Sequence, residues 1–278
     1  MIRFEGWMEA KSPIMHGGDE KTGSTVVLRT ITMWVPEYGE FARLPYLSGN
    51  GIRGKLRRLL MRDFLERLGV EPEKLSTKLY HVLFTGGALE STDATSGQID
   101  LELRKRIRDL LPPVSLLGAA VGNQMVPGKL RLGHCFPVSR EYRAYLPEFL
   151  RDDPRAEQHV YAFTDESFQT RRDELRAERE EDEQAMQMKV NFQCFVPGTR
   201  FYHWFALEYA TPLEESCFGH MMELFRASPF LGGSASSGHG EVIFEYRPEL
   251  PSGEDFRSFV DEKAGEIQDL FAELEARL

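Results

Sequence analysis

The chain has 278 residues, of which 41% are hydrophobic and 28% are charged. This composition excludes a disordered chain, a collagen-like rod and a coiled coil, and the length suits one large domain or two small ones. No window approaches the roughly 18 apolar residues of a membrane span, and the N-terminus has no apolar signal core. We therefore expect a cytoplasmic protein without a membrane partner. The three cysteines form no CxxC motif, which disfavours a disulfide framework and a thiolate zinc site.

The net charge of −10 is unevenly distributed along the chain. Residues 173–183 carry seven acids and two bases, and residues 249–278 carry nine acids and three bases. These two segments contribute −11, so the rest of the chain sums to +1. Residues 48–67 carry six bases and two acids, or +4. Because binding depends on the field within a Debye length of about 8–10 Å, an anionic partner is compatible with the acidic total.

The hydrophobic pattern predicts an α+β fold. Alternation predicts a strand over residues 2–10, and the 3.6-residue period of Ile52, Leu56, Leu60 and Phe64 predicts a helix over residues 51–68. A Gly-rich loop is predicted over 12–23, and further strands are predicted over 25–35, 129–138, 188–196, 199–210 and 241–247. Further helices are predicted over 74–84, 101–111, 211–227 and 253–278. The second of these ends at Pro112-Pro113, the third begins with a capping box, and the fourth is capped by Ser252. This order is compatible with a ferredoxin-like sheet, and the charged residues 151–187 are expected to be a partly helical insertion.

The densest motif is Gly49-Asn50-Gly51-Ile52-Arg53-Gly54, which matches the GxGxxG pattern before a predicted helix. A dinucleotide site is disfavoured, because Pro45 precedes the motif and no buried parallel strands surround it. Small residues at a helix N-terminus expose backbone N–H groups, and Arg53 and Lys55 follow within two turns, so the pattern favours an anion site for phosphate. The alternative is a tight loop with a solvated basic face.

A second Gly-rich loop, Gly233 to Gly240, has the GxxxxG spacing of a P-loop without its lysine and hydroxyl, which disfavours ATP hydrolysis. Its backbone can approach a polyanion, or it is a plain flexible loop. His16 lacks companion metal ligands, and we expect His134, Cys135 and His220 to be strand or core residues. In the aromatic strand 201–209, there are two alternatives: both faces are core, or one face stacks nucleobases.

Residues 12–62, 114–120 and 229–243 together resemble the RAMP superfamily of CRISPR effector proteins. The resemblance rests on SGNGIRGKLRR, on LGGSASSGHGEV before a strand, and on the early His16-Gly17-Gly18. Leu44 to Asn50 resembles the segment that leads into the first helix of that family, and Leu116-Leu117-Gly118 resembles its L-F-G element. Within the superfamily the chain is most similar to the backbone, Cas-seven-like subunits of type IV, with those of type III next.

The resemblance implies a single RAMP-type domain over 1–278, with an RNA-recognition-motif-like (ferredoxin-like) palm and inserted finger and thumb segments. The palm would comprise mainly 1–84, 112–150 and 188–247, the inserted segment 85–111, the thumb 151–187 and the C-terminal helix 253–278. Such subunits polymerise along guide RNA, and each thumb kinks the guide. The implied partners are guide RNA (crRNA), other copies of the chain, other CRISPR effector subunits and complementary target nucleic acid, with no cofactor.

The resemblance also suggests which residues touch the guide. The expected RNA contacts are His16, Lys21, Ser48, Asn50, Arg53, Lys55, Arg57, Arg58, Gly232, Gly233, Ser234, Ser236, Ser237 and His239. The expected thumb wedge between nucleotides comprises Met186, Met188 and Lys189.

Nuclease activity is not expected. Type III backbone subunits cut target RNA with an Asp ahead of the first helix, whereas the comparable stretch Thr30 to Pro36 has no acid and Asp19 lies too early to be equated with it. Three alternatives stay open: a dinucleotide-dependent enzyme that uses the GNGIRG loop, a type III-like subunit with target-RNA cleavage, and an interaction module with neither ligand. The acidic segments either face a basic patch of a neighbouring subunit or are solvated.

Overall fold

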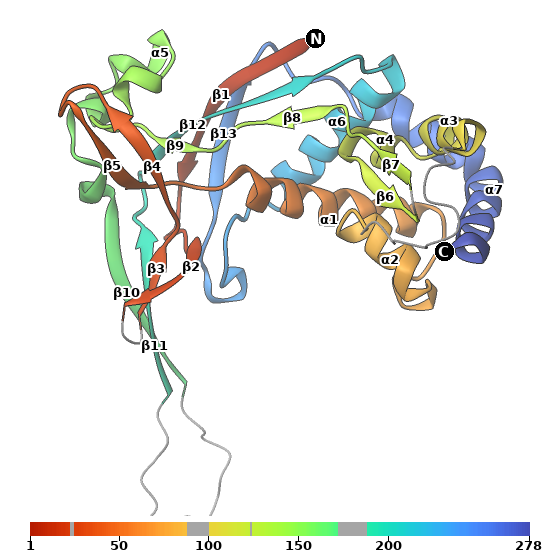
Figure 1. Cartoon of the computed structure of the whole chain (residues 1–278), viewed down its shortest axis with the longest axis horizontal. Coiled ribbons are helices and arrows are strands. Elements are labelled where there is room, and N and C mark those ends of the chain that lie inside the picture. Colours follow the sequence, from red (N-terminus) through yellow and green to blue (C-terminus); the bar gives the residue numbers. More distant parts are fainter. Residues whose placement is uncertain (23–24, 88–99, 123, 172–187) are drawn as a thin grey trace, which may run out of the picture.

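The computed structural model describes residues 1–22, 25–87, 100–122, 124–171 and 188–278. A central antiparallel sheet runs through the molecule (Figure 1) in the order β13-β1-β12-β8, and β9 also pairs with β12. Its strands are β1 (Ile2–Ala10), β8 (Leu130–Leu132), β9 (Phe136–Pro137), β12 (Arg200–Leu207) and β13 (Val242–Arg247). The predicted strand 129–138 is therefore two short strands, separated by Gly133, His134 and Cys135.

Two helices connect these strands in the ferredoxin-like order. Helix α1 (Gly49–Arg67) follows β1, and α6 (Pro212–Ala227) follows β12 with the predicted capping box. The last strand, β13, lies beside the first, as in RNA-recognition motifs, which confirms the expected α+β class. The alternating residues of β1 and β12 bury one sheet face against the helices, where the rings of Phe4 and Phe205 lie 5.2 Å and 5.3 Å from that of Phe218.

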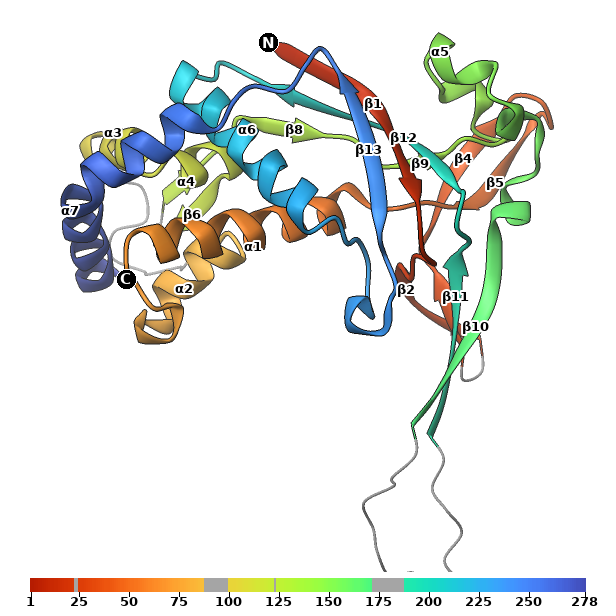
Figure 2. The same cartoon turned by 180° about the vertical axis from the view of Figure 1, so that it is seen from behind.

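Four further helices gather at one end of the molecule (Figures 1 and 2). They are α2 (Thr77–Phe84), α3 (Leu101–Leu110), α4 (Pro112–Leu117) and α7 (Glu254–Arg277), beside the hairpin β6 (Ala119–Val121) and β7 (Gln124–Val126). The predicted stop at Pro112-Pro113 starts a new helix there, because proline fits the first turn of a helix. Gly253 is the N-cap of α7, so the predicted cap residue Ser252 lies one position earlier, but its hydroxyl accepts from Glu254 N–H at 3.3 Å.

A second sheet lies at one end of the central sheet, and its strands β10 (Thr164–Arg171) and β11 (Met188–Phe195) extend away from the palm as a hairpin, here called the projecting hairpin (Figure 1). The order of this sheet is β10-β11-β3-β2, with β3 (Thr25–Leu28) and β2 (Gly17–Thr22). The predicted strand 25–35 is split, because β4 (Thr30–Val35) leaves this sheet to pair with β5 (Glu40–Pro45). Likewise, the predicted loop 12–23 contains β2, and the described part of the predicted helical insertion contains β10.

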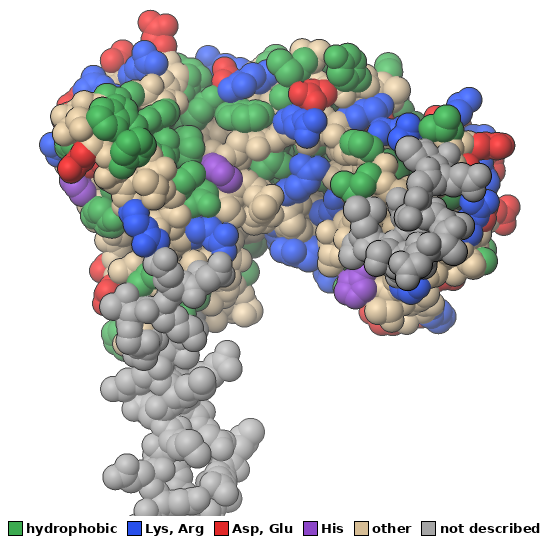
Figure 3. All heavy atoms as spheres, in the orientation of Figure 1, with side chains coloured by type: hydrophobic (Ala, Val, Ile, Leu, Met, Phe, Trp, Pro, Cys, Tyr) green, Lys and Arg blue, Asp and Glu red, His purple; other side chains and the backbone are tan. Residues whose placement is uncertain are grey.

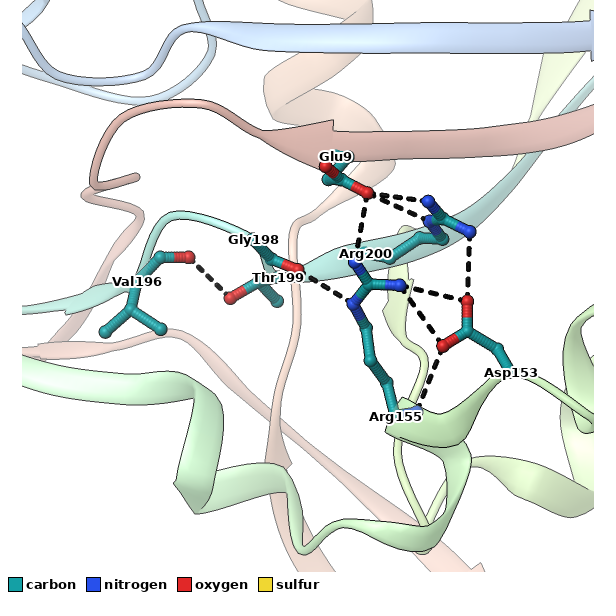
Figure 4. A network of polar contacts seen from close by, with 7 residues as sticks. All are labelled: Glu9, Asp153, Arg155, Val196, Gly198, Thr199 and Arg200. Carbon is teal, nitrogen blue, oxygen red and sulfur yellow. Dashed lines mark hydrogen bonds and ion pairs between the residues drawn. The ribbon is translucent and has the colours of Figure 1, made fainter.

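The segment that includes α5 (Glu148–Arg151) covers the outer face of the central sheet. Leu146, Leu150 and Ala156 pack there against Tyr202 and partly buried tryptophans. Figure 4 shows how ion pairs fix this segment: Glu9 of β1 and Asp153 each bind both Arg155 and Arg200. The side of β12 that carries Tyr202 and Trp204 is thus packed against protein in this region, and the alternate side, with Phe201 and Phe205, is core.

Candidate nucleic-acid interface

Three segments that are far apart in sequence meet at the start of α1 and enclose a groove of about 240 Å³, here called the α1 groove. Hydrogen bonds from Gly233 N–H to the Met15 carbonyl (2.9 Å) and from Gly240 N–H to the Pro13 carbonyl (2.8 Å) tie two of these segments together. The structure therefore brings the three predicted motifs into one place. The groove is lined by Met15, His16, Gly17, Leu47, Ser48, Gly51, Ile52, Lys55, Arg58, Phe230, Leu231, Gly232 and Gly233.

The positive charge of the α1 groove comes from Lys55 and Arg58, one turn apart on the same side of α1. Partial burial, reinforced by the nearby charges of Arg58 and Arg62, lowers the pKa of Lys55. These like charges lack a carboxylate among the groove-lining residues, so an anion entering the groove would relieve their repulsion. In Figure 3, Lys and Arg side chains gather across the centre of the face drawn, and the outline is hollowed between the projecting hairpin and the helical end.

Arg57 and Arg53 have a different role from the one predicted. Arg57 is buried, and its guanidinium donates to the carbonyls of Leu83 (3.2 Å), Leu117 (2.9 Å) and Gly118 (2.7 Å). Arg53 donates to the carbonyls of Leu117 (2.6 Å) and Leu130 (3.0 Å). The prediction that these two arginines contact phosphate is therefore corrected: the buried Arg57 joins α1 to α2 and α4, and the half-buried Arg53 joins α1 to α4 and β8.

The start of α1 is held by side chains rather than left open. Ser48 is the N-cap, and its hydroxyl accepts from Gly51 N–H at 3.2 Å. His16 Nε2 accepts from Ser48 N–H at 3.0 Å, and His134 Nδ1 accepts from Gly49 N–H at 2.9 Å. The amides of residues 48, 49 and 51 are thus engaged within the protein. The prediction of an anion site on these amides is therefore wrong, because each amide already has an acceptor within the protein.

The glycines of the GNGIRG motif allow close packing around this helix start. A Cβ on Gly49 would lie 2.8 Å from the carbonyl oxygen of Gly133, and one on Gly51 would lie 3.0 Å from His16 Cε1. Both residues lie inside α1 rather than in a loop before it. The strand before the motif, β5, pairs antiparallel with β4 in a two-stranded sheet. A dinucleotide fold requires a buried parallel strand at this place, so the geometry does not support that alternative.

The second Gly-rich loop forms the other wall of the α1 groove. Gly232 has φ +78°, and a Cβ there would lie 2.2 Å from the Met15 carbonyl oxygen. Ser234 adopts the left-handed conformation with φ 61°, and Ser236 and Ser237 are exposed. The ring of His239 packs edge-on against Phe192 of β11, with centroids 5.4 Å apart. The loop thus connects the groove to the base of the projecting hairpin, and Asn50 is exposed at the start of α1.

Several predicted contact residues lie outside the described residues or are described by their backbone alone. Met186 is outside the described residues, and for Lys21, Met188 and Lys189 the structure gives the backbone strand alone. Two residues that the sequence analysis did not select are prominent. His134, expected to be a strand or core residue, is exposed and holds α1, and Phe168 is 71% exposed on β10. For Phe168 the available signal was an aromatic residue in the charged segment 151–187, whereas nothing in the local sequence distinguished His134.

The other candidate residues take structural roles. Cys135, Cys194 and Cys217 are free and buried, and His220 is buried with Nε2 2.7 Å from a carboxylate oxygen of Asp63. Among the residues that the structure describes, no three His, Cys, Asp or Glu side chains are grouped as they would be around a metal ion. In the same residues, no helix has the length and apolar character needed to cross a membrane.

Comparison with known proteins identifies the fold. No family model and no curated protein sequence matches the chain. Among solved structures, the chain is similar to a chain of one described as a "Type IV-B CRISPR Complex", with a TM-score of 0.64 and 21% sequence identity. The similarity covers 91% of this chain and 93% of that one. The two chains share a fold over nearly their whole length, which confirms the expected α+β, RNA-recognition-like palm.

Proposed function

We propose that this chain is a guide-RNA-binding backbone subunit of a CRISPR ribonucleoprotein complex, without nuclease activity of its own. The observation that carries the proposal is the α1 groove, in which Lys55, Arg58 and the Gly-rich loop 232–240 converge. The groove lies in a fold shared with a chain of a Type IV-B CRISPR complex. That similarity supports the assignment to the same kind of assembly.

The groove suits the backbone of a single RNA strand better than its bases. Lys55 and Arg58 supply charge for phosphates, and Ser48, Ser234 and the loop glycines allow close approach of sugar and phosphate. Contacts to the backbone carry no sequence information, so the guide bases stay available for pairing with a target. The proposed RNA contacts are therefore His16, Lys21, Ser48, Asn50, Lys55, Arg58, Gly232, Gly233, Ser234, Ser236, Ser237 and His239.

The projecting hairpin is the proposed thumb. Phe168 offers an exposed aromatic ring on β10, which can stack on a nucleobase or insert between two. Met186, Met188 and Lys189 remain the predicted wedge further along the same segment. The hairpin base contacts the Gly-rich loop through Phe192 and His239, so a strand that follows the groove meets the thumb next.

The test is a charge reversal in the groove with a matched control. Lys55→Glu/Arg58→Glu and Arg104→Glu/Lys105→Glu change the net charge equally, and the control pair lies on α3 away from the groove. We expect single-stranded RNA binding to weaken by roughly 100-fold in the groove variant, or about tenfold per contact, and to change little in the control. The salt slope of log K should fall by about 1.4, for two lost contacts to a single strand. Equal losses in both variants would contradict the proposed groove.

The absence of nuclease activity needs a separate test. Asp19 is the acid nearest in sequence to the groove segment that contains His16. We expect Asp19→Ala to leave any trace of RNA cleavage unchanged in the presence of divalent metal. Metal-dependent cleavage that disappears in this variant would favour the type III-like alternative.

A further inference from the structure

Two histidines approach the start of α1 from different elements. His16 comes from the segment before β2, and His134 comes from the connection between β8 and β9. They accept from the successive amides of Ser48 and Gly49, at 3.0 Å and 2.9 Å. The first amides of a helix have no carbonyl partner within the helix, so such acceptors determine how its start is held.

The hydrogen bonds require opposite tautomers. An imidazole nitrogen that accepts from an amide carries no proton, so the proton of the neutral ring lies on the other nitrogen. His16 accepts through Nε2 and therefore carries its proton on Nδ1. His134 accepts through Nδ1 and therefore carries its proton on Nε2. Burial, with a contribution from Arg29, lowers the pKa of His16 to about 4, and partial burial lowers the pKa of His134. Both directions agree with rings that accept a hydrogen bond through an unprotonated nitrogen.

The same contacts determine where the groove cations lie. Lys55 and Arg58 lie about two and two and a half turns along the helix that begins at Gly49. Gly51 leaves room for the His16 ring, because a Cβ on residue 51 would lie 3.0 Å from Cε1 of His16. Tilting the first turn would therefore move both cations relative to the Gly-rich loop on the opposite wall.

We propose that His16 and His134 are a pair of positioning residues, neutral and of opposite tautomer, that fix the start of α1 so that Lys55 and Arg58 face the RNA backbone. The inference rests on the proposed function. It assigns His16 a role as an acceptor for the protein backbone, with its Nδ1–H left as a neutral donor, rather than a role as a cation that contacts phosphate. It gives His134 a role that its sequence context did not indicate.

Amide side chains provide a crossed test of this geometry. The Gln Oε1 atom is as many bonds from the backbone as His Nε2, and the Asn Oδ1 atom is as many as His Nδ1. We expect His16→Gln to bind single-stranded RNA roughly tenfold more tightly than His16→Asn, the effect of one hydrogen bond kept or lost. We expect the opposite order at the other position, with His134→Asn roughly tenfold tighter than His134→Gln. Each position thus has a matched control, and equal affinities for Asn and Gln at both positions would overturn the inference.

Nitrogen chemical shifts of the RNA-free wild type test the tautomers without any variant. We expect the unprotonated nitrogen to be Nε2 in His16 and Nδ1 in His134, seen in long-range ¹H–¹⁵N spectra at pH 7. The same tautomer in both rings would overturn the inference even if the variants fail to fold. A wild-type protein that does not bind RNA, with the expected tautomers, would overturn the proposed function and leave the hydrogen-bond geometry intact. RNA binding by a protein with the wrong tautomers would overturn the inference about the two histidines and leave the proposed function intact.

Discussion

Arg57 and Arg58 are neighbours in sequence and have opposite environments. Arg58 faces the α1 groove, whereas Arg57 is 5% exposed and donates to three backbone carbonyls. The difference follows from the helix period, which turns successive residues by about 100°. A basic residue on the inner flank of α1 finds carbonyls, and one on the other flank finds solvent and any bound anion.

This contrast predicts different consequences for the same substitution. Arg57→Leu leaves the carbonyls of Leu83, Leu117 and Gly118 without this donor, so we expect a loss of about 3 kcal/mol or more in the free energy of unfolding. Arg58→Leu should change it by less than about 0.5 kcal/mol. Urea denaturation measures both values. If Arg57→Leu is as stable as Arg58→Leu, the guanidinium does not hold α1 to the α4 region.

His16 predicts how stability depends on pH. Its pKa is about 4 in the folded chain, lowered mainly by burial and then by Arg29, and about 6.5 in an unfolded chain. The unfolded state therefore binds more protons between these values, and stability falls as the pH drops from about 6.5 towards 4.

The comparison with His16→Gln isolates this effect, because Gln does not titrate. We expect the wild type to lose about 1–2 kcal/mol more than the variant between pH 7 and pH 5. Thermal or urea unfolding of the RNA-free protein across this range measures the difference. Other buried groups, such as His203 with a pKa lowered by burial to about 3, titrate alike in both proteins and cancel. Parallel profiles would contradict the assignment of a neutral His16.

At the scale of elements, the Gly-rich loop 232–240 forms one wall of the α1 groove. Its regular structure is limited to a short turn at Ala235–Ser237. Its shape depends on backbone conformations that favour glycine. Gly232 and Gly238 both have φ +78°, but a Cβ on Gly232 would lie 2.2 Å from the Met15 carbonyl oxygen, whereas Gly238 has open space around it. The two positions therefore separate local strain from close packing.

Alanine at these two positions gives the corresponding prediction. Gly238→Ala should cost about 1 kcal/mol of stability from the left-handed conformation alone. Gly232→Ala carries the same strain and must also move the loop away from Met15, so we expect a loss of more than about 2 kcal/mol and weaker RNA binding. Urea denaturation and RNA titration of the two variants measure this. Equal losses would show that contact with Met15 does not shape the groove.

Local patterns predicted some elements well and could not predict others. The period of Ile52 to Phe64 locates α1 and the capping box at Thr211 locates α6, because each signal is formed by residues that are close together in sequence. The split of residues 25–35 was not predictable, since β3 and β4 have similar β-branched composition and differ in distant partners. The partners of Arg57 lie 26 to 61 residues away, so its burial also required the tertiary structure.

On the scale of the whole molecule, Lys and Arg side chains gather across the centre of one face and border the hollow beside the projecting hairpin (Figure 3). Asp and Glu side chains on that face are scattered around its outer edges. A total charge of −10 is therefore compatible with a local site for a polyanion. The hairpin of β10 and β11 projects away from the central sheet (Figure 2). The proposed function requires that a long RNA strand follow the α1 groove past this hairpin to a neighbouring subunit.

This arrangement predicts that RNA sets the size of the assembly. If each copy binds one segment of the guide backbone, the number of copies rises in proportion to RNA length, and RNA of twice the length should carry about twice as many. Light scattering coupled to size exclusion, with the 260 to 280 nm absorbance ratio, measures mass and RNA content together. The Lys55→Glu/Arg58→Glu variant should stay small with either RNA, and RNase should reduce the wild-type particle to single subunits. A particle whose mass ignores RNA length and RNase depends on protein contacts alone, and that result would favour the interaction module over the guide-binding subunit.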